Sequence, residues 1–157
     1  MNLEKYQQYS RIARGLEKAD LVLKDARIVN VFTEEIIRGD IAIQDGIIAG
    51  IGSFHGKEER DLAGRYVCPG FIDSHLHLES TLVTPAELVT VASRHGTTTF
   101  IVDPHESANV SGLAGIDYIL DQTEDVKANV YVMMPSCVPA TAIDDNGCTL
   151  TAEDMAP

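Results

Sequence analysis

The stretch from Val67 to Ser80, VCPGFIDSHLHLES, constrains the chain most, because an apolar strand in it ends in two histidines. Side chains alternate between the faces of a strand, so His75 and His77 are expected on the same side. Two imidazoles on one face can hold one metal ion at about 2.0–2.1 Å per bond. Asp73 and Glu79 lie two residues before and after the histidines, so their carboxylates point to the same side and flank the pair if the strand stays regular. The acidic, apolar setting favours a metal site over two solvated histidines at a strand end.

Composition excludes several classes of protein. The chain has 157 residues, of which 24 are acidic and 12 are basic, so a nucleic-acid surface with clustered Lys and Arg is not expected. No apolar run approaches the roughly 18–20 residues of a membrane span, and the amino end lacks the layout of a secretory signal. Cys68, Cys137 and Cys148 are widely spaced, which fits a reducing cytoplasm rather than a disulfide framework. We therefore expect a cytoplasmic protein without nucleic-acid or membrane partners.

The first part of the chain changes its hydrophobic period once. Residues 1–19 carry apolar side chains at three-and-four spacing, which predicts an amphipathic helix. From residue 20 to 66 the pattern predicts a small β-sheet domain. Its expected strands are 21–23, 27–31, 41–44 and 47–51. Asp45-Gly46 lies between the last two and is a strong hairpin signal, because both turn positions require a positive φ.

From residue 67 onward, strands and helices alternate. After the histidine strand we predict a helix at 84–95, a strand at 97–102, a helix from 110 to 120 and a strand at 129–134. Such alternation indicates a parallel α/β structure, whose carboxyl edge carries the active site in barrels and open sheets alike. The side chains expected to converge at that edge are His75, His77, Asp103, His105, Glu106, Ser136 and Cys137.

These candidates differ in strength. Standing alone, Asp103-Pro104-His105-Glu106 would be a turn with a local Asx-type hydrogen bond. Beside the histidine pair it is better interpreted as part of a site. Ser136 and Cys137 have no identifiable base for a nucleophilic role, so we expect them to shape or pack the site.

Three motifs together resemble the adenine deaminases of the metal-dependent amidohydrolase superfamily. They are PGFIDSHLHLES, GTTTFIVDPHE and PSCVPAT, and the likeness covers nearly the whole chain. The first motif marks the superfamily broadly, and the other two are more specific to adenine deaminases. The resemblance implies an α/β fold in which the first part of a (β/α)8 barrel is preceded by half of a small β-sandwich. The expected domains are a helix at 1–19, the sandwich part at 20–66 and three βα units at 67–157.

The resemblance also implies a reaction. Adenine would be hydrolysed to hypoxanthine and ammonia at a divalent, two-metal centre of manganese, iron or zinc. His75 and His77 would be metal ligands, while Asp103, His105 and Glu106 would be catalytic residues near the metal and the substrate. A metal ion lowers the pKa of a bound water from 15.7 toward about 7, and carboxylates can move its proton to the ring or the leaving amine. The full-length form is expected to be a homo-oligomer.

The chain also departs from the pattern of its relatives. They tend to show a Glu near Asp144–Asp145, so substrate contacts from that loop stay open. A (β/α)8 barrel takes about 250 residues, and only three barrel strands are expected here. We therefore expect an amino-terminal portion that is inactive alone, with open sheet edges that favour association.

Two alternative functions stay open, and the motif pattern excludes a third. Another amidohydrolase, such as a cyclic-amide hydrolase or a deacetylase, would share the H-x-H motif. A non-catalytic metal-binding or interaction remnant would account for the truncated barrel. His77-Leu78-Glu79 imitates the H-x-E of cytidine deaminases, but the P-C-x-x-C partner of that zinc site is missing, so this third interpretation is set aside.

Overall fold

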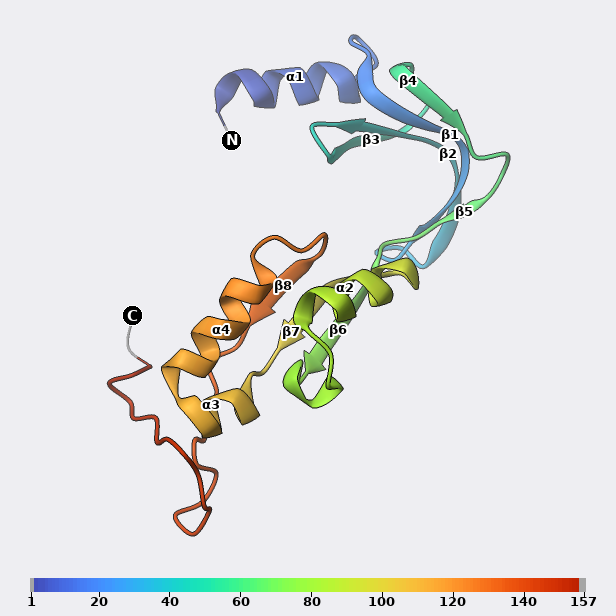
Figure 1. Cartoon of the computed structure of the whole chain (residues 1–157). Coiled ribbons are helices and arrows are strands. Elements are labelled where there is room, and N and C mark those ends of the chain that lie inside the picture. Colours follow the sequence, from blue (N-terminus) through green and yellow to red (C-terminus); the bar gives the residue numbers. More distant parts are fainter. Residues whose placement is uncertain (1, 156–157) are drawn as a thin grey trace. The chain divides into compact units, whose positions relative to one another are not determined.

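The computed structural model describes residues 2–155 and divides into two units, Met1–Pro69 and Gly70–Pro157. Each unit has its own sheet (Figure 1). The first unit contains α1 (Leu3–Ala13), β1 (Ala19–Asn30), β2 (Glu35–Gln44), β3 (Ile47–Gly52), β4 (Gly56–Asp61) and β5 (Tyr66–Val67). The second contains β6 (Phe71–Leu76), η1 (Glu79–Thr81), α2 (Pro85–Arg94), β7 (Thr97–Val102), α3 (His105–Ser111), α4 (Leu113–Thr123) and β8 (Asn129–Val132).

The first helix is shorter than the predicted 1–19. The Asn2 side chain caps α1 by accepting a hydrogen bond from the Lys5 backbone N–H (2.9 Å), which satisfies a donor that the helix itself cannot. The helix ends at Ala13, and Gly15 follows with φ +70°, a conformation that glycine adopts without steric strain. Ile12 is the buried residue of the helix and packs in the core of the first unit.

The first sheet has the strand order β3-β2-β1-β4, with β5 also paired to β1. The hairpin prediction is confirmed: Asp45 and Gly46 have φ angles of 51° and 76° between β2 and β3. The prediction of two short strands before it is wrong. Residues 19–30 form one strand with a register shift between Leu23 and Ala26, where Asp25 has a positive φ of 49°. A bulge of this kind interrupts the period-two pattern without ending the strand.

Strand β4 was not predicted. Its sequence, GKEERD, is mostly charged and exposed, so it has no apolar alternation that would indicate a strand. It pairs in parallel with β1, which places charged side chains at the end of the sheet order. Charged edge strands resist pairing with other chains.

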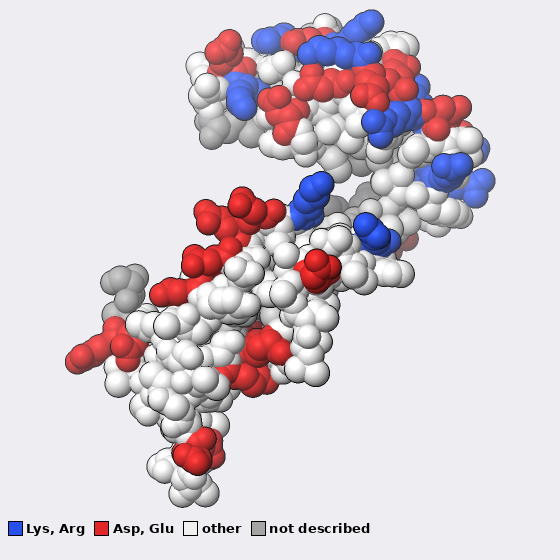
Figure 2. All heavy atoms as spheres, viewed as in Figure 1, with Lys and Arg blue, Asp and Glu red and all other residues white. Residues whose placement is uncertain are grey.

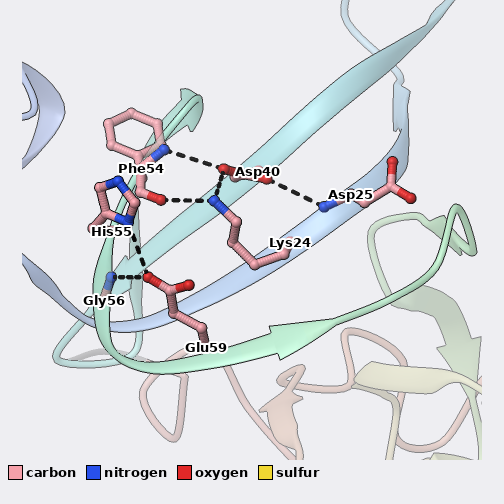
Figure 3. A network of polar contacts seen from close by, with 7 residues as sticks. All are labelled: Lys24, Asp25, Asp40, Phe54, His55, Gly56 and Glu59. Carbon is pink, nitrogen blue, oxygen red and sulfur yellow. Dashed lines mark hydrogen bonds and ion pairs between the residues drawn. The ribbon is translucent and has the colours of Figure 1, made fainter.

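A polar network fixes the bulge of β1 to its neighbours (Figure 3). The Lys24 ammonium donates to Asp40 Oδ2 (2.5 Å) and to the Phe54 carbonyl (2.9 Å). Asp40 in turn accepts from the backbone N–H groups of Asp25 (3.1 Å) and Phe54 (3.2 Å). One carboxylate therefore joins β1, β2 and the connection between β3 and β4.

The second unit has a parallel sheet in the order β6-β7-β8, as the alternation predicted. The histidine strand begins at Phe71 rather than at Val67, because Val67 pairs with Ile28 in the first sheet. Gly70 directly precedes the histidine strand. A Cβ atom at this position would lie 2.1 Å from the Thr98 hydroxyl oxygen, so only glycine allows the backbone to lie this close to the Thr98 side chain. The buried core of this unit consists of Leu78, Val89, Phe100, Val102 and Ile119.

Helix α2 follows its sequence signals closely. The Thr84 hydroxyl accepts from the Glu87 backbone N–H (3.4 Å), and Pro85 stands at the start of the helix, as a capping sequence with Pro at the first helical position predicts. Gly96 follows the helix with φ +102°. The predicted end of this helix is therefore confirmed within a residue.

The helical segment between β7 and β8 is longer than predicted and is broken. It begins at His105 instead of 110, and Gly112, with φ 62° and ψ −136°, separates α3 from α4. The two helices lie close, because a Cβ atom on Gly115 would be 2.2 Å from the Ser107 carbonyl oxygen. The predicted loop residues His105 and Glu106 therefore lie in the first turn of α3, immediately after the end of β7.

Charge is distributed unevenly between the two units. Arg94 and Lys127 are the basic residues after position 69, so the acidic excess belongs to the second unit, where red groups outnumber blue ones in the view of Figure 2. None of the helices within residues 2–155 combines the length and the apolar character needed to cross a membrane.

Candidate metal centre

The two histidines of the H-x-H motif meet at the end of β6. His75 lies in the strand, and His77 follows directly after the last strand residue, Leu76. The two Nε2 atoms are 3.2 Å apart, and the rings stand edge to face with their centroids 5.0 Å apart. The motif thus presents two imidazole nitrogens to the same point.

Asp103 joins the histidines from the neighbouring strand. It follows the end of β7, and its backbone N–H donates to the Leu76 carbonyl (2.9 Å), which aligns the carboxyl ends of the two parallel strands. One donor atom from each of His75, His77 and Asp103 lies within 4.8 Å of the others. This confirms that the carboxyl edge of the sheet gathers potential ligands from two strands.

A divalent cation fits these three residues. Two ligands on a tetrahedral ion with bonds of about 2.0–2.1 Å lie roughly 3.4 Å apart, and the two Nε2 atoms are separated by 3.2 Å. Asp103 Oδ1 is buried without a hydrogen-bond partner, and the nearest ring nitrogen of His105 is 3.9 Å away, too far for a hydrogen bond. A buried carboxylate oxygen without a donor is costly, and a cation would satisfy it. Two imidazoles and one carboxylate suit zinc, iron or manganese.

The outer face of His77 is held by a second group of polar side chains. Its Nδ1 lies 2.8 Å from Glu106 Oε2, and the Ser80 hydroxyl donates to Glu106 Oε1 (2.8 Å). Glu79 Oε1 accepts from the backbone N–H groups of Glu106 (2.9 Å) and Ser107 (3.2 Å). These two N–H groups lie in the first turn of α3, where they have no intrahelical acceptor.

The two glutamates of this group have opposite pKa shifts. Burial raises the pKa of Glu79, and the nearby Glu106 carboxylate raises it further, against the lowering effect of the Ser107 N–H. Burial alone would also raise the pKa of Glu106, but hydrogen bonds, first from Ser80 and then from Glu79 and His77, lower it to about 2. The opposite shifts favour the ionised form of Glu106 over that of Glu79. An ionised Glu106 favours the tautomer of His77 that carries its proton on Nδ1, which leaves Nε2 free to bind a cation.

The other residues predicted for the site lie outside the two donor groups. His105 stands in the first turn of α3 with its ring centroid 6.3 Å from that of His77, and it belongs to neither donor group. Asp73 was expected beside the histidines only if the strand stays regular, but the pairing register shifts between Asp73 and Leu76, and Asp73 belongs to neither donor group. Ser136 and Cys137 are exposed after β8 and supply no donor to either group found within residues 2–155.

One contribution to the site was expected for the wrong structural reason, and another was missed. Glu79 was expected from strand parity, but the chain leaves the strand at Leu76 and Glu79 reaches the site from the η1 turn. Ser80 was not singled out at all. The only signal for it is its place directly after H-L-H-L-E, and its partner Glu106 lies 26 residues further along the chain.

Comparison with known proteins agrees with this geometry. Residues 66–155 match the Amidohydrolase family. The chain is 56% identical over 157 residues to an adenine deaminase of Desulfitobacterium hafniense, covering 100% of this chain and 28% of the relative. It is 51% identical over 140 residues to an adenine deaminase of Geobacillus kaustophilus, covering 89% of this chain and 24% of that relative. The chain thus spans about a quarter of the length of these relatives, in their amino-terminal part.

A solved structure shares the fold. It is an N-acyl-D-glutamate deacylase from Bordetella bronchiseptica, complexed with zinc and a phosphonate inhibitor. The TM-score is 0.57 at 22% sequence identity, over 75% of this chain and 30% of that chain. At this level of identity the likeness concerns the fold alone.

Proposed function

Because the chain belongs to the amidohydrolase family, we propose that it forms part of an enzyme that hydrolyses adenine to hypoxanthine and ammonia at a divalent metal centre. The observation that carries the proposal is the donor set of His75, His77 and Asp103 at the carboxyl ends of adjacent parallel strands. The identity of 56% with an adenine deaminase along the whole chain favours adenine as the substrate.

The proposal includes the architecture around this site. The three parallel strands β6, β7 and β8 would open a (β/α)8 barrel, and the five-stranded sheet of the first unit would be one half of a small β-sandwich. A two-metal centre of manganese, iron or zinc and a homo-oligomeric full-length form belong to the same proposal. A reducing cytoplasm is supported by the three free cysteines, since disulfides persist mainly in oxidising compartments.

The residues of the chain would divide the chemistry among them. The metal ion supplies a Lewis acid that makes water a nucleophile at neutral pH. His75 and His77 would hold the ion through Nε2, and Asp103 would add a carboxylate whose buried oxygen has no other partner. His105, whose ring nitrogen is 3.9 Å from that oxygen, would exchange protons near the substrate. As the C6–O bond forms and the C6–N bond breaks, one proton of the water must reach the leaving amine to give ammonia, and the other must reach ring atom N1 to give hypoxanthine.

A chimeric enzyme tests the proposal. The aligned segment of the Desulfitobacterium hafniense adenine deaminase is replaced by this chain, which aligns over its 157 residues. We expect the purified, manganese-loaded chimera to convert adenine to hypoxanthine with release of one ammonia per turnover. His77→Ala should abolish turnover, and Asp103→Asn should lower kcat/KM by about 10²-fold or more. His95→Ala is the matched control, because His95 is exposed at the end of α2 and should leave turnover unchanged.

Two results would overturn the proposal. A folded, metal-loaded chimera that prefers hydantoin or dihydropyrimidine to adenine would assign the chain to a cyclic-amide hydrolase. A folded, metal-loaded chimera that hydrolyses none of these substrates would support the non-catalytic remnant instead.

A further inference from the structure

The hydrogen bonds behind His77 form a continuous chain that begins at Ser80. The Ser80 hydroxyl donates to one oxygen of Glu106, and the other oxygen of Glu106 faces His77 Nδ1, each at 2.8 Å. We propose that Ser80 is a positioning residue for the metal ligand His77 and that it acts through Glu106. The inference deepens the proposed function, because it assumes that His77 binds the metal ion.

The first step concerns the two nitrogens of His77. A neutral imidazole carries one proton, and only its unprotonated nitrogen can bind a cation. A carboxylate next to Nδ1 keeps the proton there. The lone pair is then on Nε2, the atom that faces His75 Nε2 at 3.2 Å. Glu106 thus selects the nitrogen of His77 that belongs to the donor set.

The second step concerns what holds Glu106. Its side chain is 52% exposed, so packing alone does not fix its carboxylate, and a free glutamate side chain has considerable rotamer entropy. Its backbone N–H is bound by Glu79 Oε1 (2.9 Å), which fixes the start of α3 but not the carboxylate. Besides His77 and the neighbouring Glu79 carboxyl group, Ser80 is the side chain that donates a hydrogen bond to that carboxylate among the described residues.

The third step concerns the rigidity of Ser80 itself. Ser80 lies in η1, two residues after Leu78, which is almost fully buried in the core of the second unit. The Thr81 hydroxyl and backbone N–H both donate to the Leu78 carbonyl, at 2.6 and 3.1 Å. The turn that follows the histidine motif is therefore anchored, and it delivers the Ser80 hydroxyl to a defined point. The four residues from His77 to Ser80 supply a ligand and, with Glu106, the means of orienting it.

A double-mutant cycle on metal affinity tests the proposal. The dissociation constant for Zn²⁺ is measured by chelator competition for the unmodified chain, Ser80→Ala, Glu106→Ala and the double variant. Loss of a residue that orients a ligand weakens metal binding by about 10–100-fold, so we expect a loss in that range for Glu106→Ala and about tenfold for Ser80→Ala. Ser80→Ala should add almost nothing in the Glu106→Ala background, because the two residues act in series.

The protonation of the ring gives a second readout. The ¹⁵N chemical shifts of metal-free His77 should show a proton on Nδ1 in the unmodified chain and a mixture of the two tautomers in Ser80→Ala. Ser80→Thr retains a hydroxyl and should restore both the affinity and the tautomer. Ser111→Ala, at the exposed end of α3, is the control for loss of a serine hydroxyl and should change neither.

The outcomes separate this inference from the proposed function. Unchanged zinc affinity and tautomer in Ser80→Ala, or additive effects of Ser80→Ala and Glu106→Ala, would overturn the positioning role even if the chimera deaminates adenine. A chimera inactive on adenine, with coupled Ser80 and Glu106 effects on zinc binding, would overturn the substrate assignment and leave the positioning role in place.

Discussion

Carboxylates of similar chemistry take different roles according to the donors around them. Asp40 in the first unit receives an ammonium and two backbone N–H groups, so it is saturated and structural. Asp103 in the second unit has a buried oxygen with no donor, so it has an acceptor available for a cation. Glu106 lies between these cases, because both of its oxygens have partners and one of the partners is His77, the proposed ligand. The number of hydrogen-bond donors around each carboxylate thus separates the structural Asp40 from Asp103, which has an oxygen left for a metal ion.

Asp40→Asn should destabilise the chain in a pH-dependent way. Burial alone would raise the pKa of Asp40, but the hydrogen bond from Lys24 and those from Phe54 and Asp25 hold it below its ordinary value of 3.8. A depressed pKa stabilises the folded state above the ordinary pKa, and this stabilisation is lost as the pH falls through the folded-state pKa. Asparagine leaves Lys24 unpaired and one N–H without an acceptor, so we expect a loss of about 1–3 kcal/mol at pH 7.

Urea unfolding of both proteins between pH 7 and pH 2.5 checks this prediction. The difference in unfolding free energy between the unmodified chain and Asp40→Asn should shrink below pH 3.8, the ordinary pKa of Asp40. Glu34→Gln, an exposed change in the same unit, should show no such difference. A gap that stays constant down to pH 2.5 would contradict the assigned role of the ionised carboxylate.

Among the elements, those with clear local signals were predicted and those set by tertiary contacts were not. The Asp45-Gly46 hairpin, strand β7 and the capped start of α2 follow from turn chemistry, β-branched residues and a capping sequence. Strand β4 has no hydrophobic period, and only its pairing with β1 makes it a strand. The single strand β1 was divided in two because the bulge at Asp25 interrupts the pattern. Propensity gives way to tertiary context at these positions.

Gly115→Ala should disturb the helix pair that carries Glu106. A Cβ atom at this position would lie 2.2 Å from the Ser107 backbone carbonyl, so α3 and α4 would have to move apart. Overpacking of this kind costs about 1–3 kcal/mol, and thermal unfolding should show the corresponding fall in Tm. Ala114→Ser, at an exposed neighbouring position in α4, is the control. Equal Tm values for the two variants would show that α3 and α4 are not closely packed.

Thr84→Ala should weaken α2 without affecting the metal centre. Its hydroxyl accepts the Glu87 N–H at the start of the helix, and removal of such a cap costs about 1 kcal/mol. Urea unfolding should detect the loss, and Thr90→Ala, at an exposed position within the same helix, should not show it. Zinc affinity of the folded Thr84→Ala chain should match that of the unmodified chain, and a weaker affinity would contradict the independence of α2 from the site.

At the scale of the whole molecule, the sequence predicted which strand ends would carry ligands but not how they are supported. The H-x-H spacing indicated His75 and His77 as ligands, whereas Asp103 was expected as a catalytic residue, and its place in the same donor group comes from the structure. The link from Ser80 to Glu106 was not predictable, because it joins a 3₁₀ turn to the start of α3 and depends on the packing of both. The sheet itself is open: β6 and β8 each pair only with β7 within the described residues.

This openness predicts self-association of the purified chain. Phe71 and Ile72 on β6 are each 63% exposed, and an apolar edge strand is a template for pairing with another chain. Light scattering after size exclusion should show oligomers whose share rises with protein concentration. Phe71→Ser with Ile72→Thr should reduce that share, and Leu3→Ser with Tyr6→Ser on α1, which are also exposed, should not. A sharp, reversible and monomeric unfolding transition would contradict the prediction.

The most direct test of the central claim is a Zn²⁺ titration of the chain and two histidine variants by isothermal calorimetry. If His75, His77 and Asp103 form a metal centre, His77→Ala should lose at least tenfold in affinity, and His95→Ala should bind like the unmodified chain. Equal binding by His77→Ala and His95→Ala would show that the ion binds elsewhere. It would remove the metal centre on which the proposed hydrolysis of adenine depends.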